Sequence, residues 1–267
     1  MNASALLKTL RQEARNARRR LGRPAVELPS ETERNILASI RSRGYAVVPD
    51  FYSVGQCAAL RADIDTLIKT HVGHVSVDAK GSDHRLFGAD RVSPLVKKFY
   101  DDPFITRMLH AHARTADNAG LTLAARLDFV QGNAGSGDGW HRDQAVNEQF
   151  KSIIYLSDVG PDNGPFEYIE KSHRPRTIIA DIAREGFAFN QNRFTNGEIE
   201  KLLARDSRKN MLRTFIAPAG TLILVNTRGI HRGMPIKEGV RYALTNYYWS
   251  GVPIPEHIRK LAITSKQ

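Results

Sequence analysis

The sequence is poor in the features that mark secreted and membrane-spanning proteins. Among its 267 residues there is one cysteine, Cys57, so no internal disulfide can form and a secreted disulfide scaffold is excluded. We expect Cys57 to be a small buried side chain. No apolar run approaches the about 18 residues of a transmembrane helix. Lys8 interrupts the short run Ala5-Leu6-Leu7, which argues against a secretory signal and favours a cytoplasmic protein.

Positive charge is concentrated at the N-terminus. The net charge is +11, and residues 1–24 carry seven basic side chains against Glu13 alone. Apolar residues recur there at the spacing of a helix face, at Leu6, Leu10, Ala14, Ala17 and Leu21. This basic helix could contact an anionic membrane, act as an organelle presequence over residues 1–23, or pack on its own domain or a second subunit. No aromatic residue precedes Tyr45, so nothing there could stack on bases, and we do not expect nucleic acid as a partner.

Helical patterns come first along the chain and strand patterns later. Residues 1–29 form the basic helix and a linker, and residues 30–267 are expected to be one domain. Within it, residues 30–120 are mainly helical, with helices at 31–43, 53–70 and 103–113, a strand at 44–49 and an irregular stretch at 72–92. Five strands are predicted in the core at 121–250, namely 121–130, 152–156, 166–169, 221–225 and 240–249. The order predicts an α+β fold in which a cupin-like jelly roll, or double-stranded β-helix, is flanked by N-terminal helices. Residues 181–212 interrupt the strands, with a helix at 198–204, and are predicted to be a lid over the site.

Three residues could hold a metal ion. His141 and Asp143 are two apart, so in a strand they would point to the same face. A jelly roll brings the later His231 close to them, which would complete a set of two histidines and one carboxylate with three open positions on the metal. Arg241 begins the next strand, and its planar guanidinium suits the distal carboxylate of a 2-oxo acid.

Residues 40–250 resemble the phytanoyl-CoA dioxygenase-like family of 2-oxoglutarate oxygenases. The resemblance rests on Gly44-Tyr45-Ala46-Val47-Val48-Pro49-Asp50-Phe51, on Trp140-His141-Arg142-Asp143, on Asn163-Gly164-Pro165-Phe166 leading into Lys171-Ser172-His173, and on the pair His231 and Arg241.

The resemblance implies iron(II) held by His141, Asp143 and His231, with 2-oxoglutarate held by Arg241 and O2 as the oxidant. Members often have a serine two residues after the distal histidine, where this chain has Gly233. Another residue must then supply that hydrogen bond, and Lys151 and Ser152 are the candidates. Relatives that transfer halide lack the carboxylate, so Asp143 favours hydroxylation.

Residues next to the metal ligands are candidates for substrate binding, namely Trp140, Arg142 and Arg232. Trp140 could equally be packing, and the two arginines, which alternate away from the metal, could face solvent instead. His173 is interpreted as a structural hydrogen-bonding residue. The remaining histidine pairs, His71 with His74 and His110 with His112, have no third ligand nearby.

The sequence therefore predicts an iron(II)- and 2-oxoglutarate-dependent dioxygenase that hydroxylates a small molecule or a glycan- or lipid-linked group. A basic surface would suit an acidic substrate. The alternative is a metal-dependent cupin that acts as a hydrolase or isomerase without 2-oxoglutarate. A third possibility is an inactive binding module anchored by the basic N-terminal helix, against which the complete ligand set argues.

Overall fold

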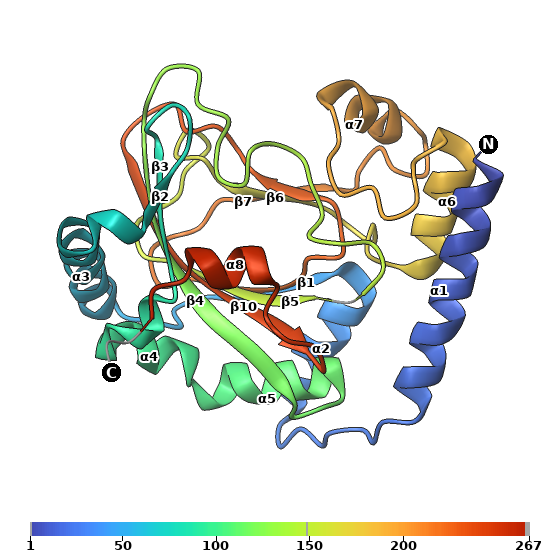
Figure 1. The fold of residues 1–267 in the computed structure, drawn as a ribbon, viewed down its shortest axis with the longest axis horizontal. Helices are drawn as coiled ribbons and strands as arrows, with labels where there is room; N and C mark the ends of the chain where they lie inside the picture. The colour runs from blue at the N-terminus through green and yellow to red at the C-terminus, as the bar shows by residue number, and fades with distance from the viewer. Residues whose placement is uncertain (1, 148, 265–267) are drawn as a thin grey trace.

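Two antiparallel sheets face each other, and helices cover the outside of the larger one (Figure 1). The computed structural model describes residues 2–147 and 149–264. The larger sheet contains, in spatial order, β1 (Tyr45–Val48), β8 (Leu222–Asn226), β5 (Phe150–Tyr155), β10 (Val240–Ser250), β4 (Asn118–Asp128), β3 (Asp83–Phe87) and β2 (Val75–Val77). The smaller sheet contains β7 (Leu212–Phe215), β6 (Phe166–Ile169) and β9 (His231–Gly233).

Helices before and between the strands complete the α+β architecture. They are α1 (Ala3–Leu21), α2 (Glu31–Arg43), α3 (Val54–Thr70), α4 (Pro94–Tyr100), α5 (Pro103–Ala113), α6 (Pro175–Glu185), α7 (Asn196–Leu203) and α8 (Glu256–Leu261), with 3-10 turns at Val72–His74 and Ala89–Arg91. Local chemistry fixes several ends. Ser53 and Gln56 form a capping box that begins α3, and Asp102 accepts hydrogen bonds from the first turn of α5.

The largest core cluster lies between the larger sheet and helices α2 to α5. It includes Ile40 of α2, Ile64 of α3 and Leu244 of β10, all fully buried, and the predicted burial of Cys57 is confirmed. Because successive side chains of a strand alternate, Leu244 and Tyr248 of β10 face the helices, while Arg241 and the other odd-numbered residues up to 247 face the smaller sheet. The inner face is therefore free to line a cavity.

Some predicted elements were wrong or incomplete. The stretch 72–92 is not irregular, because β2 and β3 form there and extend the larger sheet past β4. The strands β7 and β9 and the helices α4, α6 and α8 were not predicted. The strands β7 and β9 and the helices α4 and α8 are short and show little periodicity. Helix α6 has 11 residues, but its second half lies in the segment that was expected to be mainly loop. The segment 181–212 begins inside α6 and contains α7, so it holds more regular structure than the single helix expected.

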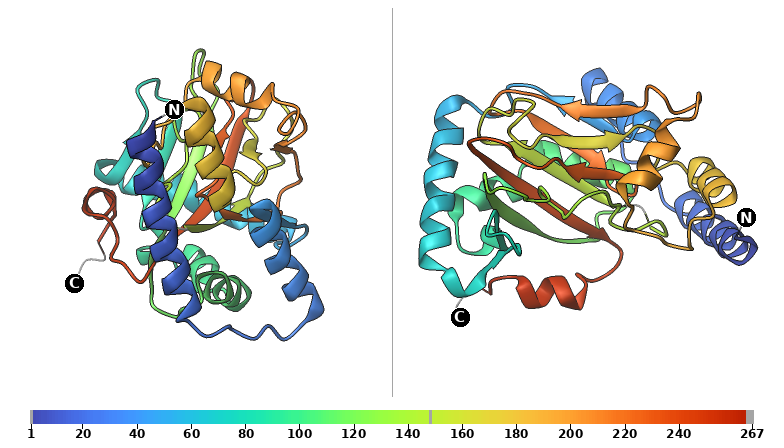
Figure 2. Two further views of the ribbon diagram at one scale, coloured as in Figure 1. Left: turned by 90° about the vertical axis from the view of Figure 1, so that its right-hand side faces the viewer. Right: turned by 90° about the horizontal axis from the view of Figure 1, so that it is seen from above.

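The basic N-terminal helix packs on its own domain. In Figure 2, α1 lies beside α6. Asn16 Nδ2 donates to the carbonyl of Val146 at 2.7 Å, and Glu13 pairs with the fully buried Arg228. The other side of α1 exposes Leu7, Leu10 and Leu21. Within the described ranges no helix has the length and apolar character needed to cross a membrane.

Gly44 offers a test of how α2 is joined to β1. This residue ends α2 in the left-handed region, with φ +107°, and a Cβ there would lie 2.1 Å from the Tyr168 hydroxyl and 2.7 Å from His173 Nδ1. Backbone strain and overpacking each cost about 1–3 kcal/mol, so Gly44→Ala should lower the free energy of unfolding by about 2–6 kcal/mol in urea denaturation.

Gly197→Ala is the matched control for Gly44→Ala. Gly197 lies in the first turn of α7, and a Cβ added there would have no atom within 4 Å, so the same methyl group should be neutral or slightly stabilising. Equal unfolding free energies for the two variants would contradict the packing described at Gly44.

Candidate functional site

The two histidines that were predicted to bind a metal are joined through their backbones. His141 N donates to His231 O at 2.8 Å, and His231 N donates to His141 O at 2.7 Å, so the loop that carries His141 forms a single bridge with β9. The expectation of a regular strand over His141 and Asp143 was wrong. Gly135, Gly137 and Gly139 all have positive φ, which coils the preceding segment and leaves His141 only isolated bridges, with His231 and with Arg193. Asp143 N donates to Thr227 O at 3.0 Å and fixes the third ligand.

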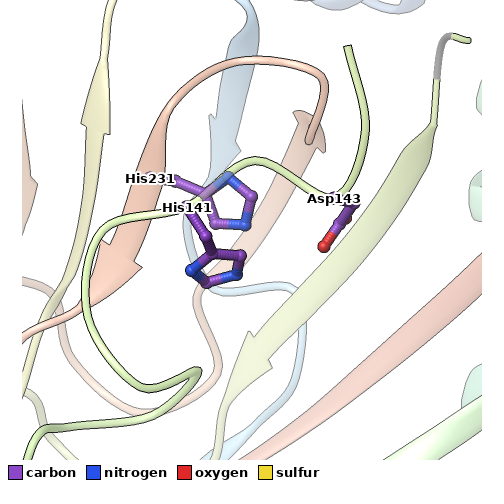
Figure 3. Close-up of side chains that lie close together, drawn as sticks. All are labelled: His141, Asp143 and His231. Carbon is purple, nitrogen blue, oxygen red and sulfur yellow. The ribbon is translucent and has the colours of Figure 1, made fainter. Parts of the chain in front are cut away.

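The side chains of His141, Asp143 and His231 converge (Figure 3). One ligand atom from each lies within 4.8 Å of the others, and the imidazole centroids are 4.2 Å apart. Each ring is oriented by the carbonyl two residues before it, since Nδ1 of His141 is 2.9 Å from Gly139 O and Nδ1 of His231 is 2.9 Å from Gly229 O. A carbonyl only accepts, so Nδ1 carries the proton and Nε2 is left as a metal ligand.

The electrostatics of the three side chains suit a cation. Burial lowers the pKa of both His141 and His231, so the imidazoles stay neutral. Burial alone would raise the pKa of Asp143, but nearby positive groups, led by the Lys151 ammonium, outweigh it and hold that pKa well below its usual value. Two neutral imidazoles and one carboxylate are the donor set of mononuclear non-heme iron(II), so these residues fit the iron that the sequence predicted.

Lys151 and Ser152, the two substitutes considered for the missing serine, have different positions. Lys151 lines the cavity beside the ligands, where its Nζ donates to Asp143 at 2.8 Å and lies 3.9 Å from the centre of the Tyr247 ring. Ser152 lies on the other face of β5, toward Tyr248, and does not line this cavity. The structure therefore does not support Ser152 as a cosubstrate contact, because neighbouring strand residues point in opposite directions.

Arg241 is buried on the inner face of β10, in the cavity that contains both histidines. Its guanidinium donates to the carbonyl of Gly164. Next to it on the inner face of β3 lies Arg85, whose Nε is 3.5 Å from Asp83. Arg85 pairs with Ala125 of β4, which in turn pairs with Ala243 of β10, and these small side chains beside the arginines leave room for a ligand.

Ser136 occupies the space that the missing serine would need. A Cβ on Gly233 would lie 2.9 Å from Ser136 O and 3.0 Å from Ser136 Cβ, and Gly233 N donates to Ser136 O at 3.0 Å. Ser136 also lines the cavity. Neither Arg85 nor Ser136 was predicted from the sequence. Arg85 was overlooked because its strand was expected to be irregular, whereas Gly233 itself was the available signal for Ser136.

The three side chains considered for substrate binding lie outside the cavity that contains the metal ligands. Trp140 is buried in the cluster beneath α6 and α7, and Arg232 stacks on its ring at 4.4 Å while pairing with Glu167 at 2.7 Å. Arg142 is also buried, over the ring of Phe194, and burial lowers its pKa to about 10. All three support the fold around the site, and their positions do not favour the substrate role considered for them.

The other histidines are placed away from the metal ligands. His173 is buried with its Nε2 3.2 Å from Arg41 O, consistent with the structural role expected for it. Across the described part of the chain, the only cluster of at least three histidine, cysteine or acidic side chains suited to a metal is His141, Asp143 and His231.

Comparisons with known proteins agree with this architecture. One similar solved structure is SnoN, a non-heme alpha ketoglutarate dependent epimerase from nogalamycin biosynthesis, with 16% identity and a TM-score of 0.60 over 82% of this chain and 83% of that one. A second is SnoK, a carbocyclase from the same biosynthesis, with 17% identity and a TM-score of 0.58 over 86% of this chain and 87% of that one. A third is HygX from Streptomyces hygroscopicus with nickel and 2-oxoglutarate bound, with 16% identity and a TM-score of 0.56 over 82% of this chain and 87% of that one. The α+β, cupin-like fold is thereby confirmed. A direct search of curated proteins finds no match.

The family comparison covers most of the chain. Residues 40–238 match the phytanoyl-CoA dioxygenase (PhyH) family, and this stretch includes His141, Asp143 and His231. Iron(II) and 2-oxoglutarate are the cofactor and cosubstrate of this family, and the ligand set and the nearby guanidinium groups fit them. The chain belongs to the phytanoyl-CoA dioxygenase family.

Proposed function

We propose that the protein is an iron(II)- and 2-oxoglutarate-dependent dioxygenase that hydroxylates a small molecule or a glycan- or lipid-linked group. The observation that carries this proposal is one cavity lined by His141 and His231 and, from the inner face of the larger sheet, by Arg241. Iron(II), 2-oxoglutarate and O2 together supply the oxidation, in which 2-oxoglutarate leaves as succinate and CO2 and one oxygen atom enters the substrate. The protein's own contribution is to bind and orient these groups.

Each cavity residue has a role in this proposal. His141, Asp143 and His231 would hold the iron, because two imidazoles and one carboxylate are a donor set of iron(II) oxygenases. Arg241 binds the distal carboxylate of 2-oxoglutarate, and Arg85 adds a second guanidinium at the same end of the cavity. Lys151 keeps Asp143 ionised and in place. The hydroxyl of Ser136 takes the position left open by Gly233.

Hydroxylation is favoured over other outcomes by the ligand set. Relatives that transfer halide lack this carboxylate, and Asp143 would occupy the position that the halide takes there. The structural neighbours SnoN and SnoK are named as an epimerase and a carbocyclase, so related folds direct this oxidation to different products. The choice depends on how the substrate is positioned next to the metal, and succinate release coupled to a hydroxylated product is the measurement that separates these outcomes.

We also propose that the segment 181–212 covers the site. Its backbone is attached to the metal-binding loop on both sides of His141, because Arg142 N donates to Asn192 O at 3.0 Å and Phe194 N donates to Trp140 O at 3.0 Å. It therefore supports the loop as well as covering it. A contact of α1 with an anionic membrane, a cytoplasmic location and a preference for anionic substrates stay predictions.

Anaerobic titration tests the proposed function directly. Iron(II) added to the purified protein, followed by 2-oxoglutarate, should give the weak visible charge-transfer band of a chelated 2-oxo acid. Candidate substrates are then screened by succinate release in air. A protein that binds iron(II) but shows no band and no 2-oxoglutarate turnover would instead be the metal-dependent cupin.

Replacing Arg241 with alanine should weaken 2-oxoglutarate binding at least about tenfold, since a charge-assisted pair is worth about 1.5–3 kcal/mol. Isothermal titration with the nickel-loaded protein measures the affinity. Arg126→Ala is the matched control, because Arg126 lies on the neighbouring strand β4 but faces outward to Asp65 and Asp128. An unchanged affinity in the Arg241 variant would favour the cupin.

Lys151→Met should destabilise the metal-free protein by about 3–5 kcal/mol, because it leaves the buried Asp143 carboxylate without its partner. Added nickel should restore most of that loss, since the metal supplies the missing positive charge and binds only the folded state. Thermal denaturation with and without nickel measures both effects. A loss of stability that nickel does not reduce would show that Lys151 acts through packing alone.

A further inference from the structure

The inner face of the larger sheet becomes aromatic just beyond the metal ligands. Lys151, which holds Asp143, lies under the Tyr247 ring. That ring in turn stacks on Trp249, with centroids 6.0 Å apart, and lies 6.3 Å from Phe87. A continuous series of contacts therefore leads from the metal-binding carboxylate to an apolar surface, here called the aromatic face and defined by Phe87, Tyr247 and Trp249.

The aromatic face is covered by the C-terminal segment of the chain. Ile254 and Ile258 pack on it half-buried, and Ala262 is buried against the same cluster. Figure 1 shows α8, which carries Ile258, lying across β4 and β10. We call residues 252–262 the C-terminal strap.

The strap is attached firmly only at its two ends. Before it, Gly251 N donates to Asp117 O at 2.8 Å; after it, Ile263 N donates to Phe87 O at 2.8 Å, and Arg91 donates to Ile263 O at 3.0 Å. Between these points the hydrogen bonds of the described residues stay within the strap itself, such as Ile258 N to Pro255 O. No side chain of α8 is buried. Moving the strap would break a few apolar contacts and no hydrogen bond to the rest of the described chain.

We propose that the primary substrate of the oxygenase binds through an apolar or aromatic part on this aromatic face, in the place of Ile254 and Ile258, and displaces the strap. The inference rests on the proposed function and extends it to the class of substrate. Three features support the proposal. The aromatic face lies next to the metal ligands, and its contacts with the strap are all apolar. An apolar ring or chain of a ligand can therefore replace the side chains of the strap. The cationic end of the cavity, at Arg241 and Arg85, then serves the cosubstrate.

A probe that needs no turnover tests this subsite. The probe is 2-naphthol, titrated against the metal-free protein and followed by its fluorescence anisotropy. Ile258→Asp should bind it at least about tenfold more tightly than the unchanged protein, because a carboxylate cannot stay packed on the apolar cluster that contains Phe87 and Trp249. Val252→Asp is the matched control, since Val252 is an exposed residue of the same strap outside the apolar cluster, and its affinity should not change.

Ile258→Ala is a milder second variant, which keeps the test valid if Ile258→Asp does not fold. It removes most of the same contact without adding charge, and should shift the naphthol affinity in the same direction by a smaller factor. If both variants lower the melting temperature while the naphthol affinity stays unchanged, the strap is only a structural cover and the proposal is overturned.

Paramagnetic relaxation decides whether the bound probe lies next to the metal. In Ile258→Asp loaded with manganese(II), the naphthol protons should relax several-fold faster than in the same variant loaded with zinc(II). Tight binding with no difference between the two metals would place the probe elsewhere and overturn the proposal. A protein that binds naphthol as expected but gives no charge-transfer band with iron(II) and 2-oxoglutarate would refute the proposed function and leave the apolar subsite standing.

Discussion

Two backbone hydrogen bonds between His141 and His231 place the metal ligands, and the rest of the site depends on this pairing. They join a coiled loop to β9 of the smaller sheet, so residues far apart in the sequence share one position in space. The pairing sets the distance between the imidazoles, while the carbonyls of Gly139 and Gly229 set their orientation. Asp143 is held from the opposite sheet by Lys151. A metal ion bound by these three residues would therefore be held from both sheets.

Side chains on the inner face of the larger sheet change in character along its strands. Arg241 pairs with Leu127 at one end, Ala243 with Ala125 in the middle, and Tyr247 with Leu121 toward the other end. The register therefore gives the inner face a charged end, a middle region of small side chains and an aromatic end. Lys151 connects the aromatic end to the metal ligands. Such a gradient assigns the polar cosubstrate and an apolar substrate to opposite ends of one cavity, because each group is bound best where its surroundings match it.

The sequence predicted those features that leave a local pattern. The helices α2 and α5 and the strand β6 were placed with the observed bounds, because capping residues, glycine and proline mark their ends. The order and spacing of His141, Asp143 and His231 predicted that they would converge, as they do in the structure. The strands that were missed depend on pairing with other segments: β3 pairs with β2 and with β4, but the stretch was read as irregular, and Arg85 was missed with it. Ser152 was considered beside Lys151 because the orientation of β5 was unknown, although only one of two neighbouring residues could face the cavity.

The loop that carries His141 and Asp143 is held mainly by segments that look peripheral in the sequence. Ala145 N donates to Asn190 Oδ1 at 2.8 Å, and Ala145 O accepts from Arg228 Nε at 2.7 Å. Arg228 in turn pairs with Glu13 of α1. The insertion and the N-terminal helix thus replace the sheet pairing that this loop lacks. Since α1 supports the loop with one side and exposes Leu7, Leu10 and Leu21 on another, a partner bound to the exposed side need not disturb the metal ligands.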